Sequence, residues 1–336
     1  MIDPFPLGLE IPRGTREYAW VASIVEAAER RSGVPSRWNR RLYEEPHTML
    51  LATARGDGAM TVSRPNITDP VLRAYDAQRP LTDLEKVLAR RGAIIVAHEA
   101  EHHMAELGDE AAPDAIPFPS PEEVALAEGL ADTRAFRNAD ALIQDIGMDH
   151  AVPGVLDVQV AATYPGYNAG VNGVIHGLHK LTGLPPDEVR VAIERTPRLQ
   201  RYNKMADLLI DSRLDGLMPP EHRSEVRAKL AGPLRYELGA LTRYETPNGD
   251  PKKLDGLGRE FSARAIRNVG RELEWIESDY RRAVDPESAH LQKFLQSPGG
   301  AAAGAGAAGA AAAAAPFTSL SRRLDRFRPA DGPSRS

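Results

Sequence analysis

The chain has 336 residues and no cysteine, which excludes disulfide bonds and any metal site built on thiolates. Its formal net charge of -5, with 26% charged residues, lacks the basic field that attracts nucleic acid or an anionic membrane, so we expect no nucleic-acid partner. No apolar stretch approaches the roughly 18 residues that a membrane span requires, and residues 1–6 carry no secretory signal pattern. We therefore expect no membrane span, and a protein that is cytoplasmic or exported without a conventional signal peptide.

The first predicted elements are a helix and a short hairpin. Apolar residues at helical spacing predict a helix over 15–32. Residues 47–53 and 59–63 are rich in Leu, Thr, Met and Val, and the Gly-Asp-Gly sequence at 56–58 favours a turn between them. The hairpin either offers an edge to an extended peptide through main-chain hydrogen bonds or simply covers the helix that follows.

A long helix is predicted over 82–107. Thr82 and Glu85 have the spacing of a capping box, in which each side chain satisfies a backbone N–H group that the helix start leaves open, and Gly108 supplies a left-handed stop. Residues 93–97 are apolar all round, which indicates that this turn is buried.

This helix carries an H-E-x-x-H motif, His98-Glu99-Ala100-Glu101-His102. Residues four apart share a helix face, so His98 and His102 can direct imidazole nitrogens at a single metal ion while Glu99 flanks it. With no thiolate in the chain, the motif predicts a zinc site with a general base beside it.

A second long helix follows a proline-rich stretch. Ser120 is the expected N-cap, with Pro121 at the first helical position and Glu123 completing another capping box, and the helix runs to about Ile146. If the two long helices pack antiparallel, His98 lies about 14 Å before the end of the first and Glu128 about 12 Å after the start of the second. The two residues would then sit at one level.

Beyond Gly154 the sequence is mainly helical, and 245–258 is a polar loop that either lies near the site or only joins two helices. The predicted helices cover 168–181, 186–194, 197–214, 220–241 and 259–284. Residues 299–315 are exclusively Gly and Ala, so we expect 297–336 to form a tail that does not pack.

Two imidazoles do not complete a catalytic zinc site, which takes three protein ligands and leaves a fourth position open. The metzincin continuation is absent after His102, because the required Gly and His do not follow. Glu128 is the best candidate for the third ligand, and Asp132 lies four residues later on the same helix face.

This pattern resembles the gluzincin-type zinc metallopeptidases, the group that includes thermolysin and the M1 aminopeptidases, over residues 98–132. The resemblance implies that His98, His102 and Glu128 bind Zn²⁺. It further implies that Glu99 polarises the attacking water and shuttles its proton, and that Asp132 orients a ligand histidine.

Other residues give weaker signals. A metallopeptidase usually adds a His, Tyr or Arg against the developing oxyanion, and the candidates in this chain are Tyr164, Tyr167, His176 and His179. His103 projects about 100° away from His102, so we interpret it as a surface or supporting group. Glu101 fills a free position of the motif and is interpreted as solvated or salt-bridged.

The expected fold is α+β, mostly α: a zincin-like body with a small N-terminal sheet and a helical C-terminal lobe. Its catalytic domain would span 1–296, with the N-terminal lobe ending at about 108 and the helical lobe covering 109–296. The leading function is a zinc-dependent metallopeptidase, a hydrolase whose partner is a peptide or protein substrate. The alternative is a metallopeptidase-like binding or regulatory module, or a toxin or effector that acts on a single partner. The sequence carries no signal for an oligomeric state.

Overall fold

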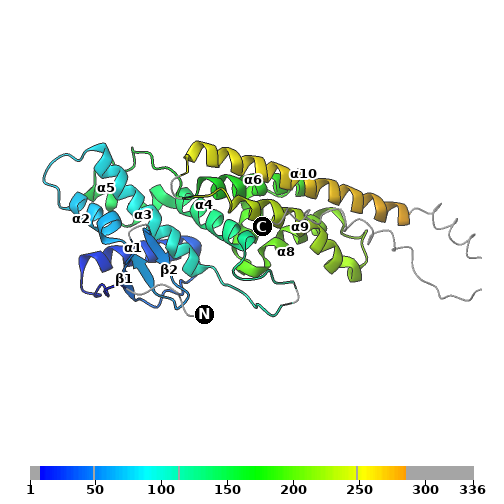
Figure 1. Ribbon diagram of the computed structural model, residues 1–336, viewed down its shortest axis with the longest axis horizontal. Coiled ribbons are helices and arrows are strands. Elements are labelled where there is room, and N and C mark those ends of the chain that lie inside the picture. The colour runs from blue at the N-terminus through cyan, green and yellow to red at the C-terminus, as the bar shows by residue number, and fades with distance from the viewer. Residues whose placement is uncertain (1–7, 48–49, 113, 247–248, 285–336) are drawn as a thin grey trace, which may run out of the picture. The chain divides into compact units, whose positions relative to one another are not determined.

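The computed structural model describes residues 8–47, 50–112, 114–246 and 249–284. The chain divides into two compact units, Met1–Arg282 and Ala283–Ser336. Within the first unit the described residues are mostly helical, with one three-stranded sheet (Figure 1). This agrees with the expected α+β, mostly α class. The tail predicted at 297–336 lies outside the described residues.

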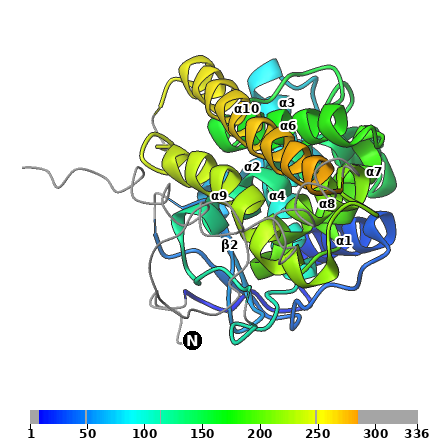
Figure 2. The same ribbon diagram turned by 90° about the vertical axis from the view of Figure 1, so that its right-hand side faces the viewer.

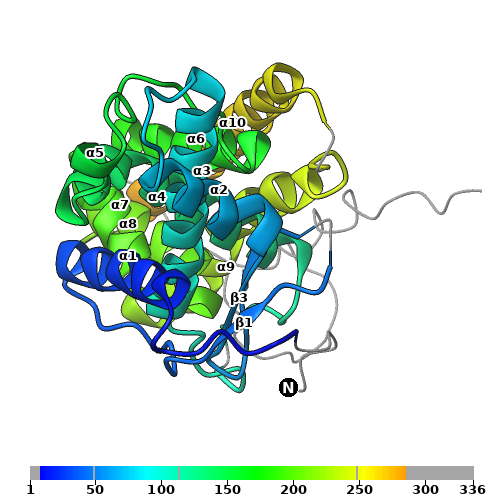
Figure 3. The same cartoon turned by 90° about the vertical axis from the view of Figure 1, so that its left-hand side faces the viewer.

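One hydrophobic core, here called the N-terminal core, lies among the first elements of the chain. Its helices are α1 (Arg16–Ser32), α2 (Asp69–Tyr75), α3 (Asp83–Met104), α5 (Met148–Ala151) and the second half of α4 (Pro121–Asp145). The N-cap Thr15 accepts from Tyr18 N–H and the left-handed Gly33 ends α1, as the sequence predicts. Figure 3 shows α1 on the side of the molecule that carries the sheet, and α1 packs against α3.

The sheet consists of β1 (Leu42–Glu44), β2 (Ala52–Ala54) and β3 (Met60–Val62) in the order β1-β3-β2. The predicted hairpin is confirmed, because β2 and β3 pair antiparallel. The sequence analysis did not anticipate β1, which pairs with β3 in parallel. Strand β2 lies at an edge of the sheet and packs against α3, so this edge adjoins the helix that carries the motif.

A second core, the C-terminal core, includes the first half of α4 together with α6 (Pro165–Thr182), α7 (Pro186–Glu194), α8 (Arg201–Arg213), α9 (Arg223–Leu241) and α10 (Pro251–Val284). Helix α10 runs along α6 (Figure 2). A Cβ at Gly173 or Gly177 would collide with Ser262 or Ile266, so only glycine permits this close approach. Three short helical turns complete the described elements: η1 (Arg64–Thr68), η2 (Arg198–Gln200) and η3 (Pro220–His222).

Several details of the predicted helix ends differ from the structure, including the start of α6 at Pro165 instead of 168. Helix α3 stops at Met104, before Gly108, because Arg37 N–H donates to the His103 carbonyl and the chain then turns away. Helix α10 begins at Pro251 instead of 259, because Asp250 accepts from Lys252 N–H and Pro251 occupies the first helical position. At the start of α4 the capping box is only half formed: Ser120 accepts from Glu123 N–H, but the Glu123 side chain accepts from Arg198 Nε instead.

Helix α4 belongs to both cores. Its residues Ala125, Leu126 and Leu130 pack into the C-terminal core, whereas Ala135, Ala139, Leu142 and Ile143 pack into the N-terminal core. The candidate residues Glu128 and Asp132 therefore lie where the helix passes from one core to the other. No helix among the described residues has the length and apolar character needed to cross a membrane.

Candidate metal centre

Helix α3 positions the two histidines of the motif. The capping box of Thr82 and Glu85 is present at its start, as predicted. The apolar turn at 93–97 is buried, which fixes the helix within the N-terminal core. His98 is 2% exposed and His102 lies one turn further along the same face, toward α4. The buried helix thus holds both imidazoles in place before any metal is bound.

Helix α4 brings Glu128 to these histidines. The two helices run antiparallel, since Arg90 in the first half of α3 pairs with Asp140 near the end of α4, and Asp132, one turn after Glu128, lies beside the earlier His98. A Cβ at Gly129 would collide with the Tyr167 carbonyl, so glycine lets α6 approach α4 directly beside Glu128. The prediction that His98 and Glu128 lie opposite each other along the two antiparallel helices is confirmed.

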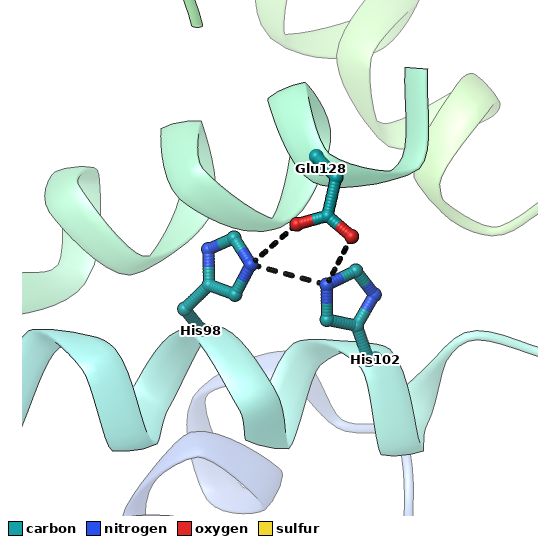
Figure 4. A group of neighbouring side chains, drawn as sticks. All are labelled: His98, His102 and Glu128. Carbon is teal, nitrogen blue, oxygen red and sulfur yellow. Dashed lines mark hydrogen bonds and ion pairs between the residues drawn. The ribbon is translucent and has the colours of Figure 1, made fainter. Parts of the chain in front are cut away.

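The three side chains point at one another across the α3–α4 contact (Figure 4). His98 Nε2 lies 3.1 Å from His102 Nε2 and 3.1 Å from Glu128 Oε2, and His102 Nε2 lies 3.4 Å from Glu128 Oε1. Ligands at 2.0–2.1 Å from a tetrahedral zinc ion are separated by about 3.3–3.4 Å. Each residue offers one ligand atom, these three atoms lie within 4.8 Å of one another, and the two contacts of Glu128 use different carboxylate oxygens. The group can therefore hold a metal ion.

The electrostatics of the group favour a cation. Burial lowers the pKa of His98, but the carboxylates of Glu128 and Glu99 outweigh burial and raise it to about 9. Burial raises the pKa of Glu128, but its contacts with His102 and His98 outweigh burial and hold the pKa well below its ordinary value. A positive charge is thus stabilised between the two helices, either as a proton or as a metal ion that takes its place.

Asp132 lies behind His98. It is fully buried, and its Oδ1 is 3.8 Å from His98 Nδ1. Asp132 accepts hydrogen bonds from Thr163 N–H and Asn168 Nδ2, which hold the carboxylate in place. His98 Nδ1 is buried and has no hydrogen-bond partner among the described residues. The separation of 3.8 Å between Nδ1 and the Asp132 carboxylate is an ion-pair distance and is too long for a hydrogen bond.

Glu99 stands beside the cluster and contacts the sheet. Its Oε2 accepts a hydrogen bond of 2.7 Å from Ala54 N–H, at the end of edge strand β2. The group that could hold a metal ion among the described residues consists of His98, His102 and Glu128, so Glu99 is near the cluster without belonging to it. Glu99 therefore lies next to the cluster with one carboxylate oxygen bonded to the sheet.

The structure brings only some of the predicted oxyanion stabilisers to the cluster. The ring of Tyr164 lies 5.6 Å from that of His98, and Tyr167 stacks on Tyr164 at 5.7 Å. His176 is exposed and begins about 18 Å along α6 from Tyr164, and His179 Nδ1 contacts the Leu184 carbonyl. The two histidines lie away from the cluster because α6 presents its N-terminal end to the site and they occupy its other half.

The two remaining residues of the motif region lie on other sides of α3. His103 is buried rather than on the surface, and burial, together with nearby His102, lowers its pKa to about 4. Glu101 is also buried and pairs with Arg134 at 3.1 Å, which confirms the salt-bridged interpretation over the solvated one. Neither residue belongs to the cluster.

The loop predicted at 245–258 is shorter in the structure, since α10 begins at Pro251, and its first part reaches the vicinity of the site. Glu245 accepts a hydrogen bond from Tyr167 N–H in the first turn of α6, next to Tyr164. The sequence analysis did not predict this contact. It also did not predict the hydrogen bonds that Thr163 and Asn168 donate to Asp132. In each contact the two partners are separated by 30 residues or more, so no local pattern could reveal it.

Comparison of the chain with protein-family models, with curated proteins and with solved structures gave no match. The assignment of a function therefore depends on the geometry and chemistry of the site itself.

Proposed function

We propose that this chain is a zinc-dependent metallopeptidase of the gluzincin type, with a zincin-like catalytic body. The observation that carries the proposal is the group of His98, His102 and Glu128, whose ligand atoms lie within 4.8 Å of one another, with the Glu99 carboxylate beside the two histidines on α3. Two imidazoles and one carboxylate are the ligand set of catalytic zinc sites that keep an open position.

The donor set favours zinc over other divalent ions. Mg²⁺ and Ca²⁺ prefer oxygen ligands in larger numbers, whereas two imidazoles suit Zn²⁺ and the later transition metals. Zinc held by such a set supplies the Lewis acidity that makes water a nucleophile at neutral pH. Asp132 would hold the His98 ring in the orientation that directs Nε2 at the ion.

Glu99 would take the proton of the attacking water and pass it to the leaving amine. The Ala54 N–H group holds one carboxylate oxygen, which restricts the rotation of the side chain. The same contact places edge strand β2 beside the base. An extended peptide that pairs with β2 would pass its backbone close to Glu99, which favours the peptide-binding interpretation of the hairpin.

Tyr164 would donate a hydrogen bond to the carbonyl oxygen as negative charge develops on it. Burial, together with the charges of Glu128 and Glu99, raises the pKa of the Tyr164 hydroxyl above its ordinary value. The hydroxyl therefore keeps its proton at neutral pH and can act as a donor.

The test separates metal binding from chemistry. Elemental analysis of the purified full chain should find one zinc per chain, and mass spectrometry of a peptide library should show cleavage that a chelator abolishes. Glu99→Gln should keep zinc and fold while cleavage falls about 10² to 10⁴-fold, the usual contribution of a general base.

Other outcomes would count against the proposal. Loss of zinc in Glu99→Gln would contradict the ligand assignment, and unchanged cleavage would assign the base to another carboxylate. Zinc binding with no chelator-sensitive cleavage would support the alternative, a metallopeptidase-like binding or effector module.

A further inference from the structure

A cavity of about 230 Å³ lies beside the metal centre, between the C-terminal end of α3, the middle of α4 and the end of α7. His102 lines it, whereas Glu99 and Glu128 do not. Its volume is below that of pockets for drug-sized ligands and suits a small group.

The wall of the cavity is rich in cations. Two carboxylates line it, Glu101 and Glu194. Five arginines do so: Arg31, Arg134, Arg137, Arg195 and Arg201. The excess of three positive charges is concentrated around a small volume, although the chain as a whole carries a net charge of -5.

Most of the charged groups in the wall are already paired. Arg134 lies 3.1 Å from Glu101 and 3.8 Å from Glu194, and Arg137 lies 3.7 Å from Glu194. Arg31 pairs with Asp145, outside the cavity, at 2.6 Å. These contacts account for both carboxylates of the wall and for three of its arginines.

Arg195 and Arg201 are left without a carboxylate within 4 Å in the described part of the chain. Arg201, the first residue of α8, is 5% exposed, and its Nε donates to the Thr196 carbonyl at 3.2 Å. Burial and neighbouring Arg198 lower the pKa of Arg201 to about 10, so it remains charged at neutral pH. The charges of Glu123 and Glu194 act on Arg201 from beyond ion-pair distance, so no carboxylate pairs with it directly. Burying a guanidinium without a direct partner is costly unless an anion binds to it.

We propose that this cavity binds an anionic oxygen group, a phosphate or a carboxylate, with Arg201 at its floor and Arg195 at its rim. A guanidinium presents its N–H donors in a planar fork that fits the oxygens of either anion. The group comes from one of two sources: a free small anion, or the acidic side chain or C-terminal carboxylate of a peptide. The site goes beyond the proposed peptidase activity and does not require the metal.

The first experiment is calorimetric titration of the full chain at low ionic strength. One titration uses inorganic phosphate, and a second uses a short peptide that ends in Asp. The control peptide ends in a C-terminally amidated Ala. We expect binding of phosphate or of the acidic peptide with a Kd of about 1 mM or tighter. Phosphate binding alone identifies a free anion, and preference for the acidic peptide identifies a peptide group. Either result supports the site.

Three variants locate the binding. Arg201→Gln should weaken it by about tenfold or more, because a buried charge-assisted hydrogen bond is lost, and Arg195→Gln at the exposed rim should weaken it about threefold. Arg259→Gln is the matched control, since it makes the same charge change at an exposed residue on α10 and should have no effect. The Arg195 variant keeps the test valid if the buried Arg201 variant does not fold.

Repeating the titration with His98→Ala tests whether the anion binds to a metal ion instead of to the arginines of the cavity. Anion binding should survive in this variant even though the predicted metal ligand is gone, so failure of the peptidase proposal leaves this result intact. No binding of either probe below about 10 mM, equal weakening in Arg195→Gln and Arg259→Gln, or loss of binding in His98→Ala would each overturn the proposal.

Discussion

The two hydrophobic cores meet along α4 and contribute differently to the candidate site. The N-terminal core fixes α3, which supplies His98, Glu99 and His102 from five consecutive residues. The C-terminal core fixes the start of α6, which supplies Tyr164 and Asn168. Two of the three proposed metal ligands and the proposed base thus come from a local motif, whereas Glu128 and the groups that support the site come from other segments.

Glu128 lies where these two contributions join. Leu126 and Leu130, two residues before and after it on α4, pack into the C-terminal core, and Ala135, about two turns later, packs into the N-terminal core. The distance between its carboxylate and the histidines therefore depends on how the two cores pack against each other. A site built across two cores is sensitive to changes in either one.

The largest expected effect comes from removing Glu128, the proposed ligand on α4. Glu128→Ala should lower zinc affinity by more than about a hundredfold, because even changes to residues behind the ligands cost 10–100-fold. Elemental analysis after dialysis against a weak chelator measures the loss. Asp140→Ala removes an exposed carboxylate from the same helix and should retain zinc. Full zinc content in Glu128→Ala would show that the two histidines alone suffice to bind zinc. Zinc binding would then not depend on how the two cores pack against each other.

The next effect tests the contribution of α6. Tyr164→Phe should lower kcat for peptide cleavage by about 10²-fold with zinc content unchanged, since one hydrogen-bond donor to the oxyanion is lost. Tyr167→Phe is the matched control, because Tyr167 stacks on Tyr164 but its ring shows no contact with His98. A larger loss in Tyr167→Phe would move the role to the second tyrosine.

A smaller effect is expected behind the metal ligands. Asp132→Asn keeps the size of the side chain and removes its charge, so zinc affinity should fall about 10–100-fold while cleavage recovers at high zinc concentration. Competition with a fluorescent zinc chelator measures this affinity. Unchanged affinity would mean that Asp132 serves to join α4 to Thr163 and Asn168 and has no influence on His98.

The sequence predicted the parts of the site that depend on helix geometry. A capping box, an apolar turn and the i, i+4 spacing suffice to place His98 and His102 on one buried face. The rise per residue then places Glu128 at their level once the two helices are assumed to be antiparallel. These predictions depend on one helix or on two helices adjacent in the chain.

The sequence could not predict contacts that depend on how distant segments pack. Strand β1 pairs in parallel with β3 through residues 18 positions apart, as Leu42 does with Met60, and parallel pairing leaves no turn signal. Tyr164 and His176 occupy one helix, and only the direction in which α6 meets α4 distinguishes the residue near the site. The arginines of the cavity likewise come from four separate segments of the chain.

The smallest expected effect concerns Glu245, which ties the segment after α9 to the start of α6. Its carboxylate accepts from Tyr167 N–H, where the N-cap residue Tyr164 provides no side-chain cap of its own. Burial raises the pKa of Glu245 from 4.5 to about 7, against the lowering effect of backbone hydrogen bonds from Tyr167 and Gly166. The folded chain therefore holds the proton of Glu245 more tightly than the unfolded chain does.

The sign of the pH dependence follows from this raised pKa. The protonated group contributes stability that is fully present below about pH 4.5 and is lost as the pH rises through about 7. Glu245→Gln keeps the acceptor oxygen and cannot ionise. The free energy of unfolding of the variant, relative to that of the parent, should therefore increase across this pH window by on the order of 1 kcal/mol, a figure that allows for solvent screening of a half-buried group. Urea unfolding of both proteins at several pH values measures the difference, and the other titrating groups cancel because both chains share them. A difference that stays constant with pH would mean that Glu245 ionises normally and that the start of α6 is held by other contacts.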